Sequence, residues 1–246
     1  MFSRLRALDT GVSLRHILFY RLCRFVCALA VYLIYRLRIA GEGRVPSTGA
    51  LLVVANHQSH LDPIFIGVGL KRRNMASLAR SGLFRNPIVG CLLRGLGSIS
   101  IRQEEGDAGA IRAAIAELKK GRLLLIFPEG SRSSDGAVSA FKRGVWLLMS
   151  RSGCDVLPAA VEGAFDAWPR SRRFPSLFGH RCAVAFGEAI PHAELARLGP
   201  DAALEILARR VDAMRLELRA ELRRSTGGRR PLPGPGDRPA VLTNRL

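Results

Sequence analysis

A histidine and an aspartate five positions apart, His57 and Asp62, have the residue types for proton-transfer chemistry. They follow residues 50–55, an apolar run that predicts a buried strand. Side chains five residues apart on a regular helix diverge by about 140°, so these two can meet only across a turn. An aspartate that orients a histidine makes that histidine a general base. The sequence therefore predicts a base at the carboxyl end of a strand, where ligands bind in open α/β sheets.

Two further polar clusters follow predicted strands. Arg102 ends the alternating run 98–102, and Glu129-Gly130-Ser131-Arg132 follows the apolar run 123–127. If these strands are parallel, all three clusters converge on one edge of the sheet. Buried or half-buried charges need partners, and a phosphate bound by arginines would be such a partner. We therefore expect an anion-binding site beside His57.

The sequence offers no nucleophile of its own beside the base. Residues 130–134 do not match the Gly-x-Ser-x-Gly pattern of a nucleophilic serine, and no cysteine adjoins His57. A base and an orienting acid without a covalent partner favour a substrate hydroxyl as the nucleophile. We expect His57 to activate such a hydroxyl toward an activated acyl group.

Metal binding is the competing use of His57, His60 and Asp62. The other histidines, His16, His180 and His192, do not follow predicted strands, so the sequence offers too few ligands for a zinc site. We expect no metal ion, and we interpret His60 as a structural residue or the start of a helix.

Composition narrows the class of protein without deciding it. The chain has 246 residues, of which 48% are hydrophobic, enough for one domain with a small appendage. The formal net charge of +18 predicts an anionic partner, which could be nucleic acid, a membrane surface or a phosphorylated substrate. No nucleic-acid-binding motif is present. The five scattered cysteines indicate free thiols in a reducing compartment.

Alternating patterns predict an α/β fold, with a mostly parallel central sheet flanked by helices. Three parts are expected: amphipathic or membrane-associated helices over 1–40, a catalytic α/β domain over 41–224, and a disordered tail over 225–246 that is rich in proline and glycine. The expected strands are 50–55, 75–80, 98–102, 123–127, 155–161 and 182–186. The expected helices are 64–70, 86–96, 108–120, 141–151 and 201–224.

The amino-terminal segment 12–39 predicts a membrane-associated helix. Its longest uncharged piece, 25–35, has eleven residues, whereas about 20 are needed to cross a bilayer. Arginines beside apolar and aromatic residues suit an anionic interface. We expect the segment to lie in or dip into the membrane, with a single span or a helix packed on the domain as alternatives. The aperiodic segment 165–181 is either a loop that touches lipid headgroups or a solvated basic loop.

Four ordered blocks resemble the glycerolipid acyltransferases, the PlsC-like 1-acyl-glycerol-3-phosphate acyltransferase family. Residues 56–62 are similar to the N-H-x-S-x-x-D block, and residues 127–133 to the F-P-E-G-[TS]-R-S block. Residues 97–102 resemble the block that ends in arginine, and 156–163 the block that contains proline. Residues 141–144 are also similar to the F-K-x-G segment. The resemblance covers roughly residues 40–190.

The resemblance implies a role for each matching residue. His57 would be the general base on the acceptor hydroxyl, and Asp62 would orient it. The residues implied to bind substrate are Arg102, Glu129, Gly130, Ser131, Arg132, Lys142 and Pro158, the last on the acyl-donor side. The implied donor is an acyl-CoA or acyl carrier protein thioester, with no other cofactor. The implied acceptor is lysophosphatidic acid, the product is phosphatidic acid, and the location is the cytoplasmic face of the inner membrane.

Two departures from the family pattern concern the acceptor and the acyl chain. Ser100 stands where an aromatic residue is frequent, and Leu157 and Ala159 flank the proline where valines are commoner. Members of the family also acylate other lyso-lipids. A lyso-ornithine lipid or a lysophospholipid is therefore the alternative acceptor.

Overall fold

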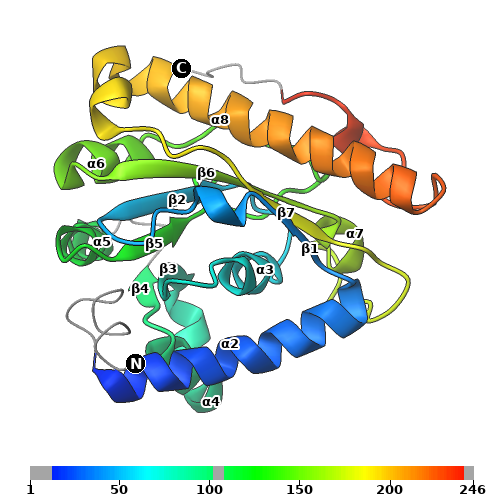
Figure 1. The fold of residues 1–246 in the computed structure, drawn as a ribbon, viewed down its shortest axis with the longest axis horizontal. Coiled ribbons are helices and arrows are strands. Elements are labelled where there is room, and N and C mark those ends of the chain that lie inside the picture. Colours follow the sequence, from blue (N-terminus) through cyan, green and yellow to red (C-terminus); the bar gives the residue numbers. More distant parts are fainter. Residues whose placement is uncertain (1–12, 102–107, 241–246) are drawn as a thin grey trace.

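The computed structural model describes residues 13–101 and 108–240 (Figure 1). These residues form a seven-stranded sheet in the order β1-β7-β6-β2-β5-β3-β4. Every neighbouring pair is parallel except β6 and β7, which are antiparallel. This confirms the α/β class with a mostly parallel sheet. The strands are β1 (Arg38–Ala40), β2 (Leu51–Ala55), β3 (Met75–Arg80), β4 (Ile99–Ile101), β5 (Leu123–Ile126), β6 (Asp155–Glu162) and β7 (Ala183–Phe186).

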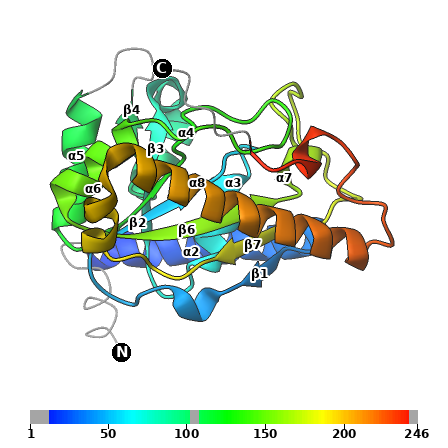
Figure 2. The same ribbon diagram turned by 90° about the horizontal axis from the view of Figure 1, so that it is seen from above.

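Helices cover both faces of the sheet (Figures 1 and 2). One layer contains α2 (Leu14–Tyr35), α3 (Asp62–Gly69) and α4 (Pro87–Gly95), and the other contains α5 (Ala108–Lys119), α6 (Gly144–Ser152) and α8 (His192–Ser225). Strand side chains alternate between the two layers. In β2, Leu51 and Val53 pack in the core with α2 and α3, whereas Leu52 and Val54 pack with α5, α6 and α8. All of β2 is buried, because helices cover it on both faces.

Two elements differ from the expectations at their boundaries. The chain does not continue as a helix to residue 39, because α2 ends at Tyr35, Arg36 has a left-handed conformation (φ 45°), and β1 follows. Helix α8 starts at His192, nine residues before the predicted start. It is kinked at Gly199 (φ 75°), which precedes Pro200, because proline excludes the helical conformation from the residue before it.

Helix α2 exposes a continuous apolar side. Tyr20, Val31 and Tyr35 are buried against the domain, but the opposite side leaves large apolar side chains in solvent. These are Leu18, Leu22, Phe25, Val26, Leu29 and Leu33. By length and composition α2 is the one helix among the described residues that could cross a membrane. Exposed apolar area of this extent is unusual on a soluble monomer and marks an interaction surface.

The segment after α8 is not the free tail that its composition predicts. Residues 229–240 fold back along α8, and the 3-10 turn η3 (Pro235–Asp237) lies beside it (Figure 1). The carboxylate of Asp237 accepts from Arg219 and Arg223 at 2.7 Å, and the carbonyl of Gly236 accepts from Arg215 at 2.7 Å. Charged hydrogen bonds thus offset the scarcity of apolar residues. The prediction of disorder is wrong for this stretch, and residues 241–246 lie outside the described part.

Candidate active site

The structure brings His57 and Asp62 together across a turn. The chain leaves β2 after Ala55, turns through residues 56–61, and begins α3 at Asp62. Nδ1 of His57 lies 2.8 Å from Oδ2 of Asp62. This contact favours the tautomer with its hydrogen on Nδ1, which leaves the lone pair on Nε2. The His57 side chain is 18% exposed while Asp62 is fully buried, so the ring is accessible and its partner is shielded from water.

Backbone groups fix the Asp62 carboxylate. Its Oδ2 accepts hydrogen bonds from the amides of Gln58 at 2.6 Å and Ser59 at 2.7 Å, in addition to the His57 contact. Asp62 is also the first residue of α3, where the positive end of the helix dipole favours a negative charge. The turn therefore sets the orientation of the imidazole through the carboxylate.

The turn after β5 forms a wall against the His57 ring. The ring stacks on Phe127 with centroids 4.0 Å apart and an interplanar angle of 13°. The carbonyl of His57 accepts from the amide of Ser133 at 2.7 Å. The strands β2 and β5 are parallel neighbours, with Val54 opposite Ile126. The two turns that leave them therefore start side by side, as the strand-end argument predicts.

Glu129 supports the backbone of His57. Its Oε1 accepts from the His57 amide at 2.7 Å, and its Oε2 accepts from the amide and the hydroxyl of Ser139 at 3.0 and 2.9 Å. Both oxygens are thus engaged within the protein. Burial raises the pKa of Glu129 to about 7, although these hydrogen bonds and the charge of His57 oppose the shift. We expect Glu129 to position His57 rather than to contact substrate.

The raised pKa of Glu129 predicts a specific pH dependence of stability. The folded protein holds this proton up to about pH 7, whereas an unfolded glutamate releases it near pH 4.5. The stabilisation is therefore complete below pH 4.5 and is lost as the pH rises through 7. We expect the free energy of unfolding of the wild type, minus that of Glu129→Gln, to fall by about 2 kcal/mol between pH 5 and pH 8. Denaturant unfolding in detergent at both pH values measures it, and a pH-independent difference would contradict the assignment.

Arg132 lies near Asp62, and two further arginines, Arg80 and Arg170, lie near Arg132. Burial lowers the pKa of Arg132, the positive charges of Arg170 and Arg80 lower it further, and Asp62 opposes them. Arg80 is the last residue of β3, and its register partner is Ile101 of β4, which immediately precedes Arg102. Sequence reasoning chose Arg102 because it follows a strand, and the same signal would have identified Arg80. Mutually repelling cations in one place favour a bound anion.

The other predicted binding residues have different surroundings. Arg102 lies outside the described residues. Gly130 (φ 74°) lies under Lys142, whose Nζ would be 2.7 Å from an added Cβ, so only glycine suits this turn. The amide of Lys142 donates to the carbonyl of Pro128 at 2.9 Å, and Ser131 is partly exposed in the same turn. Lys142 therefore packs against the turn that carries Glu129 and Arg132.

Pro158 differs from these residues because it lies within the sheet. It is buried in β6 opposite Val54 of β2, and its carbonyl accepts from the amide of Gly187 at 2.8 Å. Residues 159–162 of β6 pair with β7, so Pro158 lies one residue outside this pairing. Proline has no N–H to donate, and at this position its absence breaks no hydrogen bond between β6 and β7. The structure gives Pro158 a place in the sheet and not in the turns around His57.

His60 does not join a metal-binding group. Its ring contacts Trp168 edge-on, with centroids 5.1 Å apart. Desolvation lowers its pKa to about 4, and the positive charges of Arg132, His57 and Arg80 contribute. Across residues 13–101 and 108–240, no three His, Cys, Asp or Glu side chains are grouped so that they could hold a metal ion.

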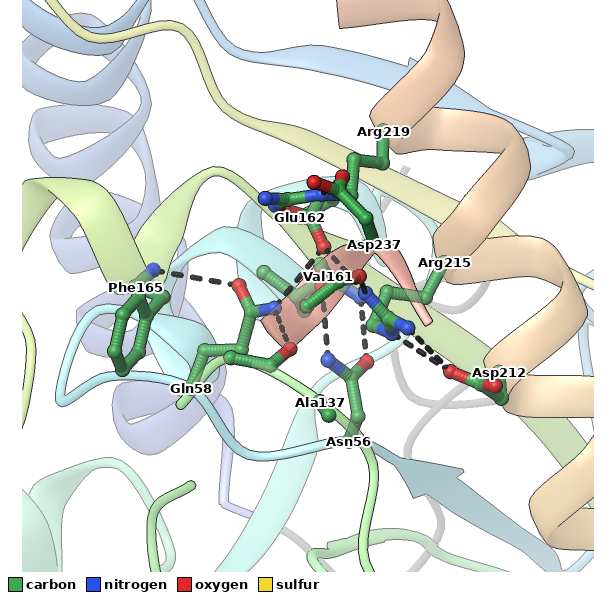
Figure 3. Close-up of polar contacts among 12 residues, drawn as sticks. Asn56, Gln58, Ala137, Val161, Glu162, Phe165, Asp212, Arg215, Arg219 and Asp237 are labelled. Atoms are coloured by element: carbon green, nitrogen blue, oxygen red, sulfur yellow. Dashed lines mark hydrogen bonds and ion pairs between the residues drawn. The ribbon is translucent and has the colours of Figure 1, made fainter. Parts of the chain in front are cut away.

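The sequence did not predict a buried polar network on the side of the residue 56–61 turn that faces β6 and α8 (Figure 3). Asn56 ties the end of β2 to β6 through two hydrogen bonds of 2.9 and 2.8 Å with the backbone of Val161. Gln58 donates to the carbonyl of Gly136 at 2.9 Å and to Oε2 of Glu162 at 3.0 Å. These side chains alternate with His57, so one face of the turn is anchored while the histidine faces outward.

Glu162 connects this turn to α8. Its Oε1 accepts from Arg219 at 2.6 Å, and its Oε2 lies 3.5 Å from Nη1 of Arg215. Arg215 is fully buried and also pairs with Asp212 at 2.6 Å. Figure 3 shows the three side chains of Arg215, Arg219 and Gln58 converging on Glu162. One carboxylate therefore connects the arginines of α8 to the turn that carries His57.

Comparison with known proteins agrees with this geometry. The acyltransferase family model matches residues 36–162, more than half of the chain. The chain belongs to this family. The crystal structure of the 1-acyl-sn-glycerophosphate acyltransferase PlsC from Thermotoga maritima has the same fold, with a TM-score of 0.69, 23% identity, and coverage of 89% of this chain and 88% of that one.

Three curated relatives are all named as 1-acyl-sn-glycerol-3-phosphate acyltransferases. The chloroplastic 1-acyl-sn-glycerol-3-phosphate acyltransferase LPAT1 of Arabidopsis thaliana is 29% identical over 58% of this chain and 40% of its own length. The 1-acyl-sn-glycerol-3-phosphate acyltransferase of Bacillus subtilis is 27% identical over 56% of this chain and 70% of its own. That of Streptococcus pneumoniae is 27% identical over 74% of this chain and 65% of its own. The match thus spans less than half of the plant relative.

Proposed function

We propose that this protein is a membrane-associated acyltransferase that moves a fatty acyl group from an acyl thioester to the free hydroxyl of lysophosphatidic acid, giving phosphatidic acid. The carrying observation is the pairing of His57 with Asp62 beside the arginines at positions 80, 132 and 170. A base next to a cluster of cations suits an acceptor that has both a hydroxyl and a phosphate. The names of the relatives support this acceptor.

The chemistry needs no covalent intermediate on the protein. Nε2 of His57 takes the proton of the acceptor hydroxyl as its oxygen attacks the thioester carbonyl carbon. The new C–O bond forms, the C–S bond breaks, and the proton passes from the imidazolium to the departing thiolate. Asp62 stabilises the imidazolium between these two transfers. Acyl-CoA or acyl carrier protein is the donor, and no further cofactor takes part.

The exposed apolar surface supports membrane association. Helix α4 leaves Ile88 and Leu92 exposed, and it packs beside α2 (Figure 1). The exposed sides of α2 and α4 together would bury apolar side chains in the bilayer. A lyso-lipid acceptor resides in the same bilayer, and the cytoplasmic face of the inner membrane is the location we propose.

Substitution of Arg132 tests the acceptor. Arg132→Ala should raise KM for lysophosphatidic acid at least about tenfold, because a charge-assisted hydrogen bond contributes about 1.5–3 kcal/mol. KM for acyl-CoA should change much less. Steady-state kinetics in detergent with lysophosphatidic acid and with phosphate-free monoacylglycerol measures both, and the preference for the phosphorylated acceptor should collapse.

Arg143→Ala is the matched control for this prediction. Arg143 is an exposed arginine that pairs with Asp201 of α8 at 3.0 Å. Its replacement removes the same charge eleven residues away from Arg132 in the sequence. KM for lysophosphatidic acid should stay within about twofold of the wild-type value, since exposed ion pairs contribute little. Equal wild-type turnover of monoacylglycerol and lysophosphatidic acid would contradict the proposed acceptor and favour another lyso-lipid.

A further inference from the structure

A basic cavity of about 410 Å³ lies outside the candidate active site. Its lining residues come from the carboxyl end of α2, the loop before β7 and the segment after α8. These three segments lie on the right in Figure 1. Its lining includes Arg36, Arg181, Arg229 and Arg230 and contains no acidic side chain. None of the residues proposed to carry the chemistry lines it. Four arginines around an open space favour a bound anion.

Two of the four arginines, Arg36 and Arg230, are available to a ligand. The other two are engaged within the protein: Arg181 donates to the carbonyl of Ser225 at 2.8 Å, and Arg229 donates to the carbonyl of Thr226 at 3.0 Å. In contrast, the guanidinium groups of Arg36 and Arg230 form no hydrogen bond or ion pair with any other described residue. They come from different segments: Arg36 follows the end of α2, and Arg230 lies in the chain after α8.

A buried histidine in the cavity wall has an unused polar atom. His180 is 7% exposed, and its Nδ1 has no hydrogen-bond partner in the described part of the chain. Burial lowers the pKa of His180, and the charge of Arg230 lowers it further. An unsatisfied buried polar group costs free energy. A ligand oxygen that accepts from this ring would remove that cost.

The rim of the cavity is apolar and continues onto the exposed side of α2. Leu33 is 72% exposed and Phe178 is 77% exposed, and both line the cavity. Phe174 and Leu177, in the same loop, are also exposed. Leu33 is the last member of the apolar stripe of α2. The cavity therefore joins a cationic interior to a surface that favours hydrocarbon.

We propose that this cavity binds the phosphate of an anionic phospholipid, with its acyl chains along the exposed side of α2. A free phosphate would use the arginines but not the apolar rim, and a nucleotide would place its polar ribose beside Leu33 and Phe178. A phospholipid matches both parts. The bound lipid would hold the carboxyl end of α2 and residues 174–181 at the bilayer surface. The proposal does not rest on the acyltransferase reaction.

Short-chain lipid binding tests the site directly. The protein in non-ionic detergent, with nitrogen-15-labelled histidine, is titrated with dihexanoyl phosphatidylglycerol, dihexanoyl phosphatidylcholine, inorganic phosphate and coenzyme A. We expect phosphatidylglycerol to shift the His180 ring resonances and to bind at least about tenfold more tightly than the other three. Coenzyme A or inorganic phosphate that shifts the same resonances at an equal or lower concentration would overturn the proposal.

Paired substitutions separate this site from the general basic charge of the protein. Arg36→Gln with Arg230→Gln should weaken phosphatidylglycerol binding at least about tenfold by calorimetry. The control, Arg151→Gln with Arg197→Gln, removes the same charge from exposed positions on α6 and early α8 and should weaken it less than about twofold. His180→Leu, which fills the space of the ring with an apolar side chain, should also weaken binding without lowering the melting temperature, because it removes a buried polar atom that has no partner in the described part of the chain. Equal losses in the two double variants would overturn the proposal.

Discussion

Replacing His57 with alanine should lower kcat for acyl transfer by about 10³-fold, the middle of the range for loss of a general base. The imidazole is oriented by a buried carboxylate at 2.8 Å, and its side chain remains partly exposed. KM for both substrates should change little, because the base interacts with the transferring proton in the transition state and contributes little to binding of the substrates. Radiolabelled acyl transfer under saturating substrate measures the loss.

His60→Ala is the matched control for this prediction. It removes the same residue type from the same turn, three positions away, where the ring contacts Trp168 and is not oriented by Asp62. Activity within about threefold of the wild type is expected. Circular dichroism should show both variants folded, since the His57 backbone hydrogen bonds to Glu129 and Ser133 do not involve its ring. Retained turnover in folded His57→Ala would exclude it as the base.

The sequence predicted the parts of the site that depend on local pattern. The apolar run before His57 identified β2, and the five-residue spacing to Asp62 required the turn that the structure shows. The strand-end argument predicted that Arg132 lies near the pair if the strands are parallel, and the structure shows that β2 and β5 are parallel neighbours. These inferences succeeded because strand burial and turn formation are encoded within a few consecutive residues.

The sequence could not predict contacts between distant segments. Gln58 and Glu162 are 104 positions apart, and Glu162 and Arg219 are 57 apart. Arg80 ends the predicted strand 75–80, so the strand-end signal applied to it as well, but the sheet order was needed to show that β3 lies between β5 and β4. The site therefore required the topology in addition to the motifs.

Helix α8 shows the same limit most clearly. Arginines on a surface helix normally face solvent, opposite the apolar side, yet Arg215 and Arg219 are buried. With Arg223 they recur every fourth residue and so share one face. That face binds Glu162 on one side and Asp237 on the other. Proline and glycine predicted disorder for the last segment because composition does not reveal an ionic partner in another element.

Removing the carboxylate of Glu162 should cost about 3–5 kcal/mol of stability, because it leaves buried arginines without their counter-ion. Glu162→Gln is the preferred change, since it keeps the volume of the side chain. The new amide would present N–H groups to Arg215, Arg219 or the amide of Gln58, all of which are donors. Chemical denaturation at pH 7 measures the loss.

Glu205→Gln is the control within α8. Glu205 pairs with Arg209 at 2.6 Å, but both side chains are exposed, so its replacement should cost less than about 1 kcal/mol. The two variants remove the same charge from the same kind of partner and differ in burial. A loss for Glu162→Gln no larger than that for Glu205→Gln would show that Arg215 and Arg219 do not need this carboxylate.

The catalytic consequence of Glu162→Gln follows from the position of Gln58 next to His57. At a temperature where the variant remains folded, a loosened Gln58 side chain should misplace the turn and lower kcat about tenfold, with a smaller change in KM for acyl-CoA. A purely structural role for Glu162 would reduce the amount of folded protein and leave kcat per folded molecule unchanged. Measuring kcat together with the folded fraction, which circular dichroism gives, distinguishes the two. Because the segment after α8 binds the same arginines, the carboxyl-terminal region would then contribute to the geometry of the base through Glu162.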